Sequence, residues 1–281
     1  MALTIDAHQH VWNLRVSPYT WLQGAPWPAI RRDFSCADLK PALADCGIQK
    51  TILVQVDNSQ ADADFVRQAA LDEPMVAGFV GWVPLDRPAE LEAALDKQAL
   101  GGKLIGIRHV LSFEPDDDWV MRPQVLEGLS VLEARGLPFE LNCDKPVYLP
   151  RVPELVRHCP RLTIIVNHLG KPPIGARGWE PWATHFAAAA ACENVYVKLS
   201  GLTTPYREGW SGADFKPYVD FALERFGPAR LMYASNWPVT LVAGSYQRQY
   251  HELRSVIAAL SDSEREAILG GTAARCYGIK T

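Results

Sequence analysis

The sequence lacks the features that would direct a protein to nucleic acid, to a membrane or to an oxidising compartment. Its 28 lysines and arginines are outnumbered by 32 aspartates and glutamates, and the net charge of −4 does not attract nucleic acid or an anionic membrane surface. It has no run of about 18 apolar residues that could span a bilayer, and no basic and apolar leader precedes Asp6. We therefore expect a cytoplasmic protein that acts on a small molecule, in an oligomeric state that the sequence leaves open.

Cysteine pairing is also missing. None of the six cysteines forms a Cys-x-x-Cys motif, and their irregular spacing favours reduced, mostly buried side chains over a disulfide framework. They are Cys36, Cys46, Cys143, Cys159, Cys192 and Cys276.

A glycine-rich turn after the first apolar run is missing as well. Val11-Trp12-Asn13 follows that run, so no glycine is present to cradle a pyrophosphate. This argues against an open, doubly wound sheet, which is the second fold that the pattern could suggest.

What the sequence does contain is an alternation of short apolar runs and longer amphipathic segments. With 281 residues, of which 48% are hydrophobic, the chain can bury one large core. Near-continuous runs such as Thr163-Ile164-Ile165-Val166 are typical of parallel strands covered on both faces. Eight strands are predicted, at Leu3–His10, Thr51–Val56, Val76–Val83, Leu104–Leu111, Pro138–Asn142, Leu162–His168, Val195–Ser200 and Arg230–Ser235.

Four intervening segments have helical periodicity. Ser59 is a predicted N-cap, and Gly136 is a predicted helix end. The eight β/α alternations, without a linker or a repeat, predict a single-domain (β/α)8 TIM barrel over residues 1–281. The four helices are predicted at Gln60–Asp72, Val120–Arg135, Ala183–Cys192 and Phe215–Phe226.

Polar side chains collect where the predicted strands end. In a (β/α)8 barrel the active site forms at these carboxyl ends, so this concentration favours an enzyme. The residues are His8, His10, Gln55, Asp57, Trp82, Arg108, His109, Asn142, Asn167, His168, Lys198, Ser200 and Asn236.

The most informative of them are His8 and His10. Side chains two residues apart on a strand share a face at a spacing of about 7 Å, and Asp6 is expected to point the same way. Two imidazoles placed like this can share a cation or a substrate carbonyl. The pair alone is equally compatible with two histidines that make ordinary hydrogen bonds.

Four segments together resemble the amidohydrolase superfamily, and they extend from the first predicted strand to the eighth. Within it they look like the lactonase branch that includes L-fuconolactonase, sulfomuconolactonase and 2-pyrone-4,6-dicarboxylate lactonase. The resemblance implies a (β/α)8 fold and hydrolysis of a cyclic ester at the barrel mouth. It also implies one or two divalent metals in some members and no metal in some lactonases. The segments are Asp6-Ala7-His8-Gln9-His10, Gly106-Ile107-Arg108-His109, Asn167-His168-Leu169-Gly170-Lys171-Pro172 and Tyr233-Ala234-Ser235-Asn236-Trp237-Pro238-Val239.

One residue departs from the family pattern. The family motif at the end of strand eight reads Ser-Asp-Trp-Pro, and its Asp is the base that activates water, whereas this chain has Asn236. An amide has nearly the same shape as a carboxyl but cannot accept a proton near neutral pH. Either an Asp→Asn substitution was made to hold an intact ligand, or the natural protein has lost or altered the chemistry; the other motifs favour the first interpretation.

Around the base, His168, His10, His8 and Arg108 are predicted to polarise the lactone carbonyl. The simpler alternatives are a structural role for His168 between two loops and an ion pair of Arg108 with Asp57. His109 is predicted to be structural, because it points to the opposite face from Arg108.

The sequence leaves open whether the site holds a divalent metal. Asn142 stands where metal-dependent members of the superfamily commonly have a histidine, and strand four offers no bridging Lys or Glu, so a binuclear site is not expected. Either no cofactor is required, or one divalent metal such as Zn²⁺ is held by His8, His10 and Asn236.

Substrate contacts are predicted from strand ends and rim loops, at Trp237, Trp82, Trp12, Asn142, Lys171 and Tyr206. Only Arg108 has a strand-end position that directs a cation inward, so a sugar-acid lactone is favoured over a dicarboxylate lactone. The prediction is a lactonase. The alternatives are a metal-dependent decarboxylase of an aromatic or muconate-type acid, and a non-catalytic binder of carbohydrate acids.

Overall fold

Eight parallel strands form one sheet in which each strand pairs with the next along the chain. The computed structural model describes residues 3–24, 27–203 and 209–280. All eight predicted strands are confirmed, each somewhat shorter than predicted or shifted at one end. The strands are β1 Ile5–Gln9, β2 Lys50–Val54, β3 Val76–Gly81, β4 Leu104–His109, β5 Phe139–Leu141, β6 Ile164–Val166, β7 Val195–Leu199 and β8 Leu231–Tyr233.

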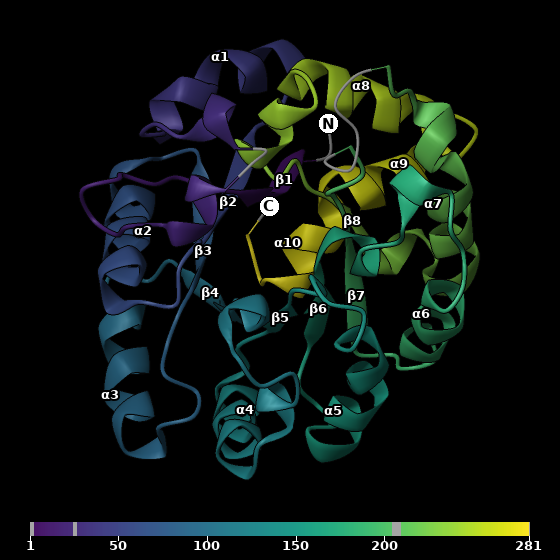
Figure 1. The fold of residues 1–281 in the computed structure, drawn as a ribbon. Coiled ribbons are helices and arrows are strands. Elements are labelled where there is room, and N and C mark those ends of the chain that lie inside the picture. The colour runs from purple at the N-terminus through teal and green to yellow at the C-terminus, as the bar shows by residue number, and fades with distance from the viewer. Residues whose placement is uncertain (1–2, 25–26, 204–208, 281) are drawn as a thin grey trace.

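Helices surround this sheet as a ring, so the chain has the predicted (β/α)8 barrel architecture (Figure 1). The four predicted helices correspond to α2, α4, α6 and α7. The helices are α1 Cys36–Cys46, α2 Gln60–Asp72, α3 Pro88–Ala99, α4 Pro123–Arg135, α5 Val152–His158, α6 Trp182–Ala190, α7 Gly212–Phe226, α8 Tyr246–Val256, α9 Asp262–Glu266 and α10 Thr272–Cys276.

Local sequence signals set the helix ends. The Ser59 side chain accepts a hydrogen bond from the Asp62 amide and caps α2, as predicted. Gly136 ends α4 in the left-handed conformation, with φ of 65°, which glycine adopts without steric cost.

The barrel closes where the end of β8 meets β1. The Asn236 amide donates to the His8 carbonyl at 2.8 Å, and the His10 amide donates to the Trp237 carbonyl at 2.7 Å. The seam therefore joins two parts of the chain that are more than 200 residues apart, and both carry predicted site residues.

An apolar cluster fills the end of the barrel opposite to the strands' carboxyl ends. Ile52, Val80, Ile165 and Met232 pack there against Ala273, Ala274 and Tyr277 from α10 and the residue after it. In Figure 1, α10 accordingly lies near the centre of the ring. The helix closes one end of the barrel and leaves the other end for polar side chains.

The prediction for Asp6 is wrong. The pairing of β1 with β2 shifts in register between Asp6 and Gln9, so the simple alternation of faces does not hold across this segment. The Asp6 carboxylate instead accepts hydrogen bonds from the Ser235 amide at 2.9 Å and from the Tyr246 hydroxyl of α8 at 3.1 Å.

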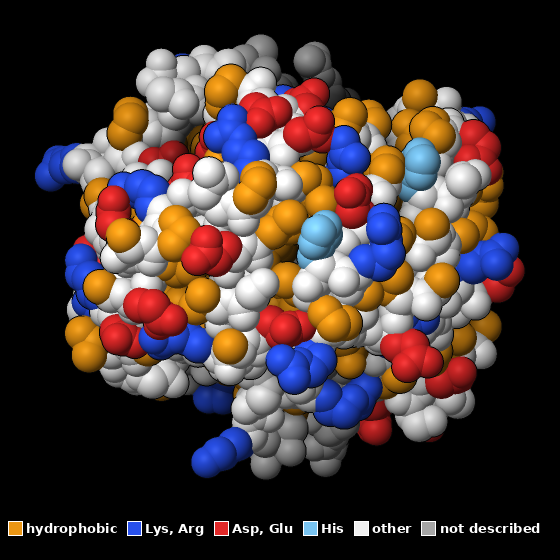
Figure 2. Space-filling view, turned by 90° about the horizontal axis from the view of Figure 1, so that it is seen from below, with side chains coloured by type: hydrophobic (Ala, Val, Ile, Leu, Met, Phe, Trp, Pro, Cys, Tyr) orange, Lys and Arg blue, Asp and Glu red, His pale blue; other side chains and the backbone are white. Residues whose placement is uncertain are grey.

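The remaining composition-based expectations concern the surface and the cysteines. All six cysteines are free. Among the described residues, no helix is long and apolar enough to cross a membrane. On the face shown in Figure 2, acidic and basic side chains are interspersed, without a single-sign patch.

Candidate active site

Two strands that are not neighbours, β5 and β7, bring charged side chains together in the barrel interior. Lys198 on β7 forms an ion pair with Glu140 on β5, with 2.6 Å between Nζ and Oε1, and both side chains are fully buried. Their flanking residues, such as Val197 and Leu199, belong to the outer core between strands and helices. Because strand residues alternate faces, an apolar outward set leaves Lys198 and Glu140 directed inward.

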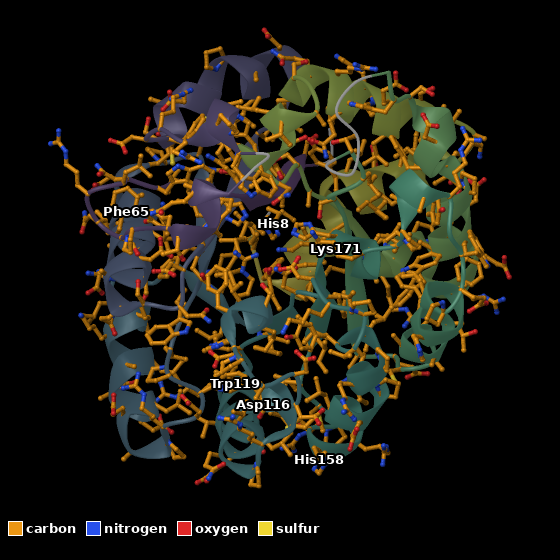
Figure 3. The ribbon with its side chains drawn as sticks, viewed as in Figure 1. His8, Phe65, Asp116, Trp119, His158 and Lys171 are labelled. Atoms are coloured by element: carbon orange, nitrogen blue, oxygen red, sulfur yellow. The ribbon has the colours of Figure 1, made fainter. Side chains whose placement is uncertain are left out.

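His8 and His10 lie directly beside this ion pair. Their Nε2 atoms are 3.0 Å apart, which confirms that the two rings converge. His8 Nδ1 is 3.2 Å from Lys198 Nζ, and His10 Nδ1 is 2.7 Å from the Val54 carbonyl. Figure 3 shows His8 near the centre of the helical ring.

Arg108 approaches the histidines from β4. Its Nη1 is 3.4 Å from His8 Nε2, and its other terminal nitrogen donates to the Gln55 carbonyl. The side-chain amide of Gln55 (Nε2) in turn donates to the backbone carbonyl of Arg108 at 2.9 Å. The ion pair with Asp57 that sequence reasoning considered does not form; Asp57 accepts from the Ser17 hydroxyl instead.

His168 lies above His8 on a strained turn after β6. His168 and Leu169 both have positive φ, of 55° and 56°, which is uncommon for residues other than glycine. The His168 ring is 4.8 Å from the His8 ring, and its Nδ1 is 2.7 Å from the Ser200 hydroxyl. A Cβ at Gly201 would lie 2.9 Å from His168 Cβ, so glycine is required where β7 passes this turn.

Asn236 completes the group at the barrel seam. It has a φ of 58°, a conformation that asparagine tolerates better than most residues, and it is 5% exposed. Its side chain lies within hydrogen-bonding reach of His10. The residue that replaces the family base is therefore next to one of the two strand-one histidines.

A cavity of about 250 Å³ lies at the carboxyl ends of the strands. The predicted residues His10, Arg108, Asn142, His168, Lys171 and Asn236 all line it, together with Trp21 and Trp27. His8 is fully buried beneath it. Lys171 Nζ is 3.1 Å from Asp144 Oδ1.

The three predicted tryptophans are not in the cavity lining. Trp12 is fully buried and donates to the Arg32 carbonyl, and Trp237 packs edge-on against Phe34. Trp82 donates to His109 Nδ1 at 3.1 Å and borders a different hollow, between α2 and α3. The aromatic side chains of the lining are instead Trp21 and Trp27, from the segment before α1, and Phe113, which follows β4. Tyr206 lies outside the described residues.

Burial and neighbouring cations keep the cavity histidines neutral. Burial, aided by Arg108, lowers the pKa of His10 to about 3. Burial also lowers the pKa of His8 and that of His168 well below the usual range, with help from Lys198 and Lys171 respectively. Burial lowers the pKa of Lys198 to about 8, although Glu140 opposes this shift.

The donor set does not fit a divalent metal. Among the described residues, no group of three His, Cys, Asp or Glu side chains could hold a metal ion. The two imidazoles and the neutral side-chain amide of Asn236 do not include the charged ligand that a single zinc usually has. In addition, the cationic groups of Arg108 and Lys198 lie within 3.4 Å of the His8 ring nitrogens, where they would repel a metal cation.

Sequence reasoning missed Glu140, Trp21 and Trp27. The sequence did contain an indication of Glu140, because a carboxylate in the middle of a buried apolar strand needs a charged or hydrogen-bonding partner. Lys198 was noted as a strand-end residue but not as a site residue. The two tryptophans carry no local signal, since only the folding of their segment brings them to the cavity.

Comparison with known proteins places these features in context. A family profile described as amidohydrolase matches residues 5–279. An L-fucono-1,5-lactonase from Burkholderia ambifaria is 36% identical, covering 88% of this chain and 84% of the relative. An L-fucono-1,5-lactonase from Burkholderia multivorans is 33% identical, covering 99% and 97%. An amidohydrolase from Burkholderia multivorans, solved with bound zinc, is 32% identical, with a TM-score of 0.88 over 99% of this chain and 100% of that one.

Proposed function

The chain belongs to the amidohydrolase family, and on that premise we propose that it is built to hydrolyse a lactone, with a sugar-acid lactone as its substrate class. The observation that carries the proposal is the convergence of His10, Arg108, His168 and Asn236 on one cavity. Two relatives named L-fucono-1,5-lactonase support the same class.

The roles follow from what each group can donate or accept. Arg108 and His168 line the cavity and can donate hydrogen bonds to a carbonyl oxygen, which stabilises the negative charge of a tetrahedral intermediate. A carboxylate in place of the Asn236 amide would take a proton from water beside His10. The resulting hydroxide would attack the carbonyl, and the proton would return to the ring oxygen as it leaves.

With Asn236 in place, this scheme has no general base. We therefore expect this chain to bind a lactone and to turn it over slowly. A non-catalytic binder of carbohydrate acids would show the same binding, and it is separated from a lactonase by restoring the carboxylate.

The charges at the cavity favour a neutral sugar lactone over a dicarboxylate. Each desolvated carboxylate needs a charge-assisted partner. Of the cations that the described lining includes, Lys171 is already paired with Asp144, which leaves Arg108. The faces of Trp21 and Trp27 suit a sugar ring.

The decarboxylase alternative requires a firmly held metal. The two histidines and Asn236 do not supply the ligand charge for one, so no step of the proposal passes through a metal. Metal analysis of protein purified without added metal, combined with product analysis, distinguishes the two reactions.

The proposal is tested by Asn236→Asp. The substitution should raise kcat/KM for aldonolactones by about 10²–10⁴-fold, the usual contribution of a positioned general base, with little change in Tm. Asn13→Asp is a matched control, because Asn13 lies outside the cavity lining and its side-chain oxygen only accepts from the Arg15 amide. No gain on any sugar or aromatic lactone would refute both the base position and the substrate class. Preferential hydrolysis of a pyrone or muconate dicarboxylate would refute the sugar-acid preference.

A further inference from the structure

The Lys198–Glu140 ion pair is unexplained by any contact with the cavity. Both side chains are fully buried and neither lines the cavity. Glu140 Oε1 also accepts a hydrogen bond from the Tyr277 hydroxyl. Burying an ion pair often contributes no net stability compared with apolar residues of the same size, so its position next to His8 needs another reason.

The position of Lys198 determines where the His8 ring proton lies. The ammonium group can only donate hydrogen bonds, and its Nζ is 3.2 Å from His8 Nδ1. Nδ1 must therefore present its lone pair to Lys198. Since His8 is neutral, its proton is on Nε2.

The proton on His10 is determined independently. His10 Nδ1 lies 2.7 Å from the Val54 carbonyl, which can only accept, so Nδ1 carries the proton and Nε2 carries the lone pair. The 3.0 Å contact between the two Nε2 atoms then has one donor, on His8, and one acceptor, on His10. The constraint from Lys198 on His8 and the constraint from the Val54 carbonyl on His10 therefore both agree with a hydrogen bond from His8 Nε2 to His10 Nε2.

The opposite assignment fails at two contacts. It would let His8 Nε2 accept from Arg108 at 3.4 Å, the longest contact of the group. The His8 Nδ1 proton would then face the Lys198 ammonium group, and the contact between the Nε2 atoms would join two acceptors.

Without Lys198, Glu140 could accept a hydrogen bond from His8. The second carboxylate oxygen of Glu140, Oε2, has no hydrogen-bond partner and lies 4.0 Å from His8 Nδ1. A carboxylate that accepts a hydrogen bond from the Nδ1–H of a histidine is the usual support of a metal-binding imidazole, because it leaves the Nε2 lone pair free for the metal.

We propose that Lys198 is a positioning residue that keeps the Glu140 carboxylate from accepting a hydrogen bond from His8 Nδ1, and so fixes the ring proton of His8 on Nε2. His8 is thereby a hydrogen-bond donor towards His10, and the two histidines cannot offer two lone pairs to one cation. The inference rests on the proposed function only in assigning His10 to the reaction site; the proton positions do not depend on any substrate.

The first test uses the unmodified protein. Ring ¹⁵N chemical shifts of histidine-labelled protein, assigned with His8→Asn, should show a protonated Nε2 and an unprotonated Nδ1 for His8 at neutral pH. The reverse pattern overturns the inference directly, whatever the enzyme does with lactones.

The second test removes Lys198. In Lys198→Met the Glu140 carboxylate can accept a hydrogen bond from His8 Nδ1–H, so the tautomer should switch and zinc affinity should rise by about 10–100-fold, measured by competition with a chromophoric chelator. In the matched double variant Lys198→Met/Glu140→Gln no carboxylate is left, so the Nε2 proton should persist and zinc affinity should rise less than in the single variant. Tyr277→Phe, which removes a different hydrogen bond from Glu140, should leave both readouts unchanged.

The outcomes separate this inference from the proposed function. Equal zinc affinity in Lys198→Met and in the unmodified protein, with the His8 proton still on Nε2, overturns the role of Lys198 even if Asn236→Asp is an active lactonase. The predicted switch of tautomer supports that role even if no lactone is hydrolysed. If Lys198→Met does not fold, the double variant and the shifts of the unmodified protein still decide.

Discussion

The barrel contains two side-chain clusters at strand ends, one around His109 and one around His168, and they differ in how fully the ring nitrogens of these two histidines are used. His109, at the end of β4, accepts from the Trp82 indole at Nδ1 and has Asn58 and Glu114 at Nε2. Its ring also stacks on Trp119, with 3.9 Å between centroids. His10 and His168 instead border the cavity. In Figure 3, Trp119 accordingly lies closer to α4 than His8 does.

The difference shows that position at a strand end does not by itself make a histidine functional. A ring whose two nitrogens are both occupied by protein groups has no capacity left for a ligand. His168 has one nitrogen, Nδ1, next to Ser200, and none of the described residues hydrogen-bonds to its other nitrogen; the side chain borders the cavity. The two clusters should therefore respond to mutation in opposite ways, one in activity and the other in stability.

The largest effect is expected from His168→Asn in the Asn236→Asp protein. Asparagine tolerates the left-handed backbone at this position, so the fold should be retained. Loss of one donor to the developing oxyanion should lower kcat/KM for an aldonolactone by about 10²–10³-fold. A decrease of less than threefold in steady-state kinetics would place His168 in the same structural class as His109.

The next effect concerns the pH dependence of stability. The folded-state pKa of His10 is about 3, below that of an unfolded histidine, so the unfolded chain binds a proton that the folded chain does not bind between about pH 6.5 and 3. Stability should therefore fall on acidification through this range, with a contribution from His10 of up to about 1.4 kcal/mol per pH unit.

His10→Asn tests this slope. Urea unfolding at pH 6.5, 5.5 and 4.5 should show a shallower loss of unfolding free energy in the variant, whatever its stability at pH 6.5. Between pH 7 and 8 the slopes of the two proteins should agree. Equal slopes below pH 6.5 would mean that the His10 ring is protonated in the folded protein.

His109→Asn should act on stability alone. The substitution leaves the Trp82 indole N–H without its acceptor, and an unsatisfied buried donor costs about 1–3 kcal/mol. Unfolding in urea should show this loss, while kcat/KM in the Asn236→Asp background should change by less than threefold. A large loss of activity in a stably folded variant would remove the distinction between the clusters.

The smallest effect is expected at the aromatic residues of the two regions. Trp27→Ala should raise KM for a sugar lactone by about 2–10-fold, since a ring contact contributes about 0.5–1.5 kcal/mol. Trp119→Phe, at the His109 cluster, should leave KM unchanged and lower Tm. The opposite result would mean that the ligand lies at the His109 cluster rather than in the cavity.

Features that depend on local sequence or on the general rules of the fold could be predicted from the sequence. The strands were predictable because parallel strands covered on both faces are continuous apolar runs, and the helix limits at Ser59 and Gly136 depend only on local backbone chemistry. The convergence of His10, Arg108 and His168 followed from the rule that strands of a barrel end at one rim.

The remaining features depend on contacts between distant segments. Trp82 had the same strand-end signal as the cavity residues, but its indole donates to His109, a partner that the sequence does not identify. The structural role predicted for His109 agrees with its contacts to Trp82, Asn58 and Glu114. Trp21 and Trp27 reach the cavity from a segment without strands. Asp6 was misplaced because a register shift cannot be recognised in a five-residue strand.

The seam between β1 and β8 also has a consequence for how the molecule folds. The hydrogen bonds from Asn236 to His8 and from His10 to Trp237 join residues more than 220 positions apart. Contacts of such long range carry a large loop-closure cost, and proteins dominated by them fold slowly. Secondary structure can therefore form while the two halves of the site are still apart. In refolding experiments we expect ligand binding to recover after the far-ultraviolet circular dichroism signal. Binding would then report on closure of the barrel between β1 and β8 rather than on chain collapse.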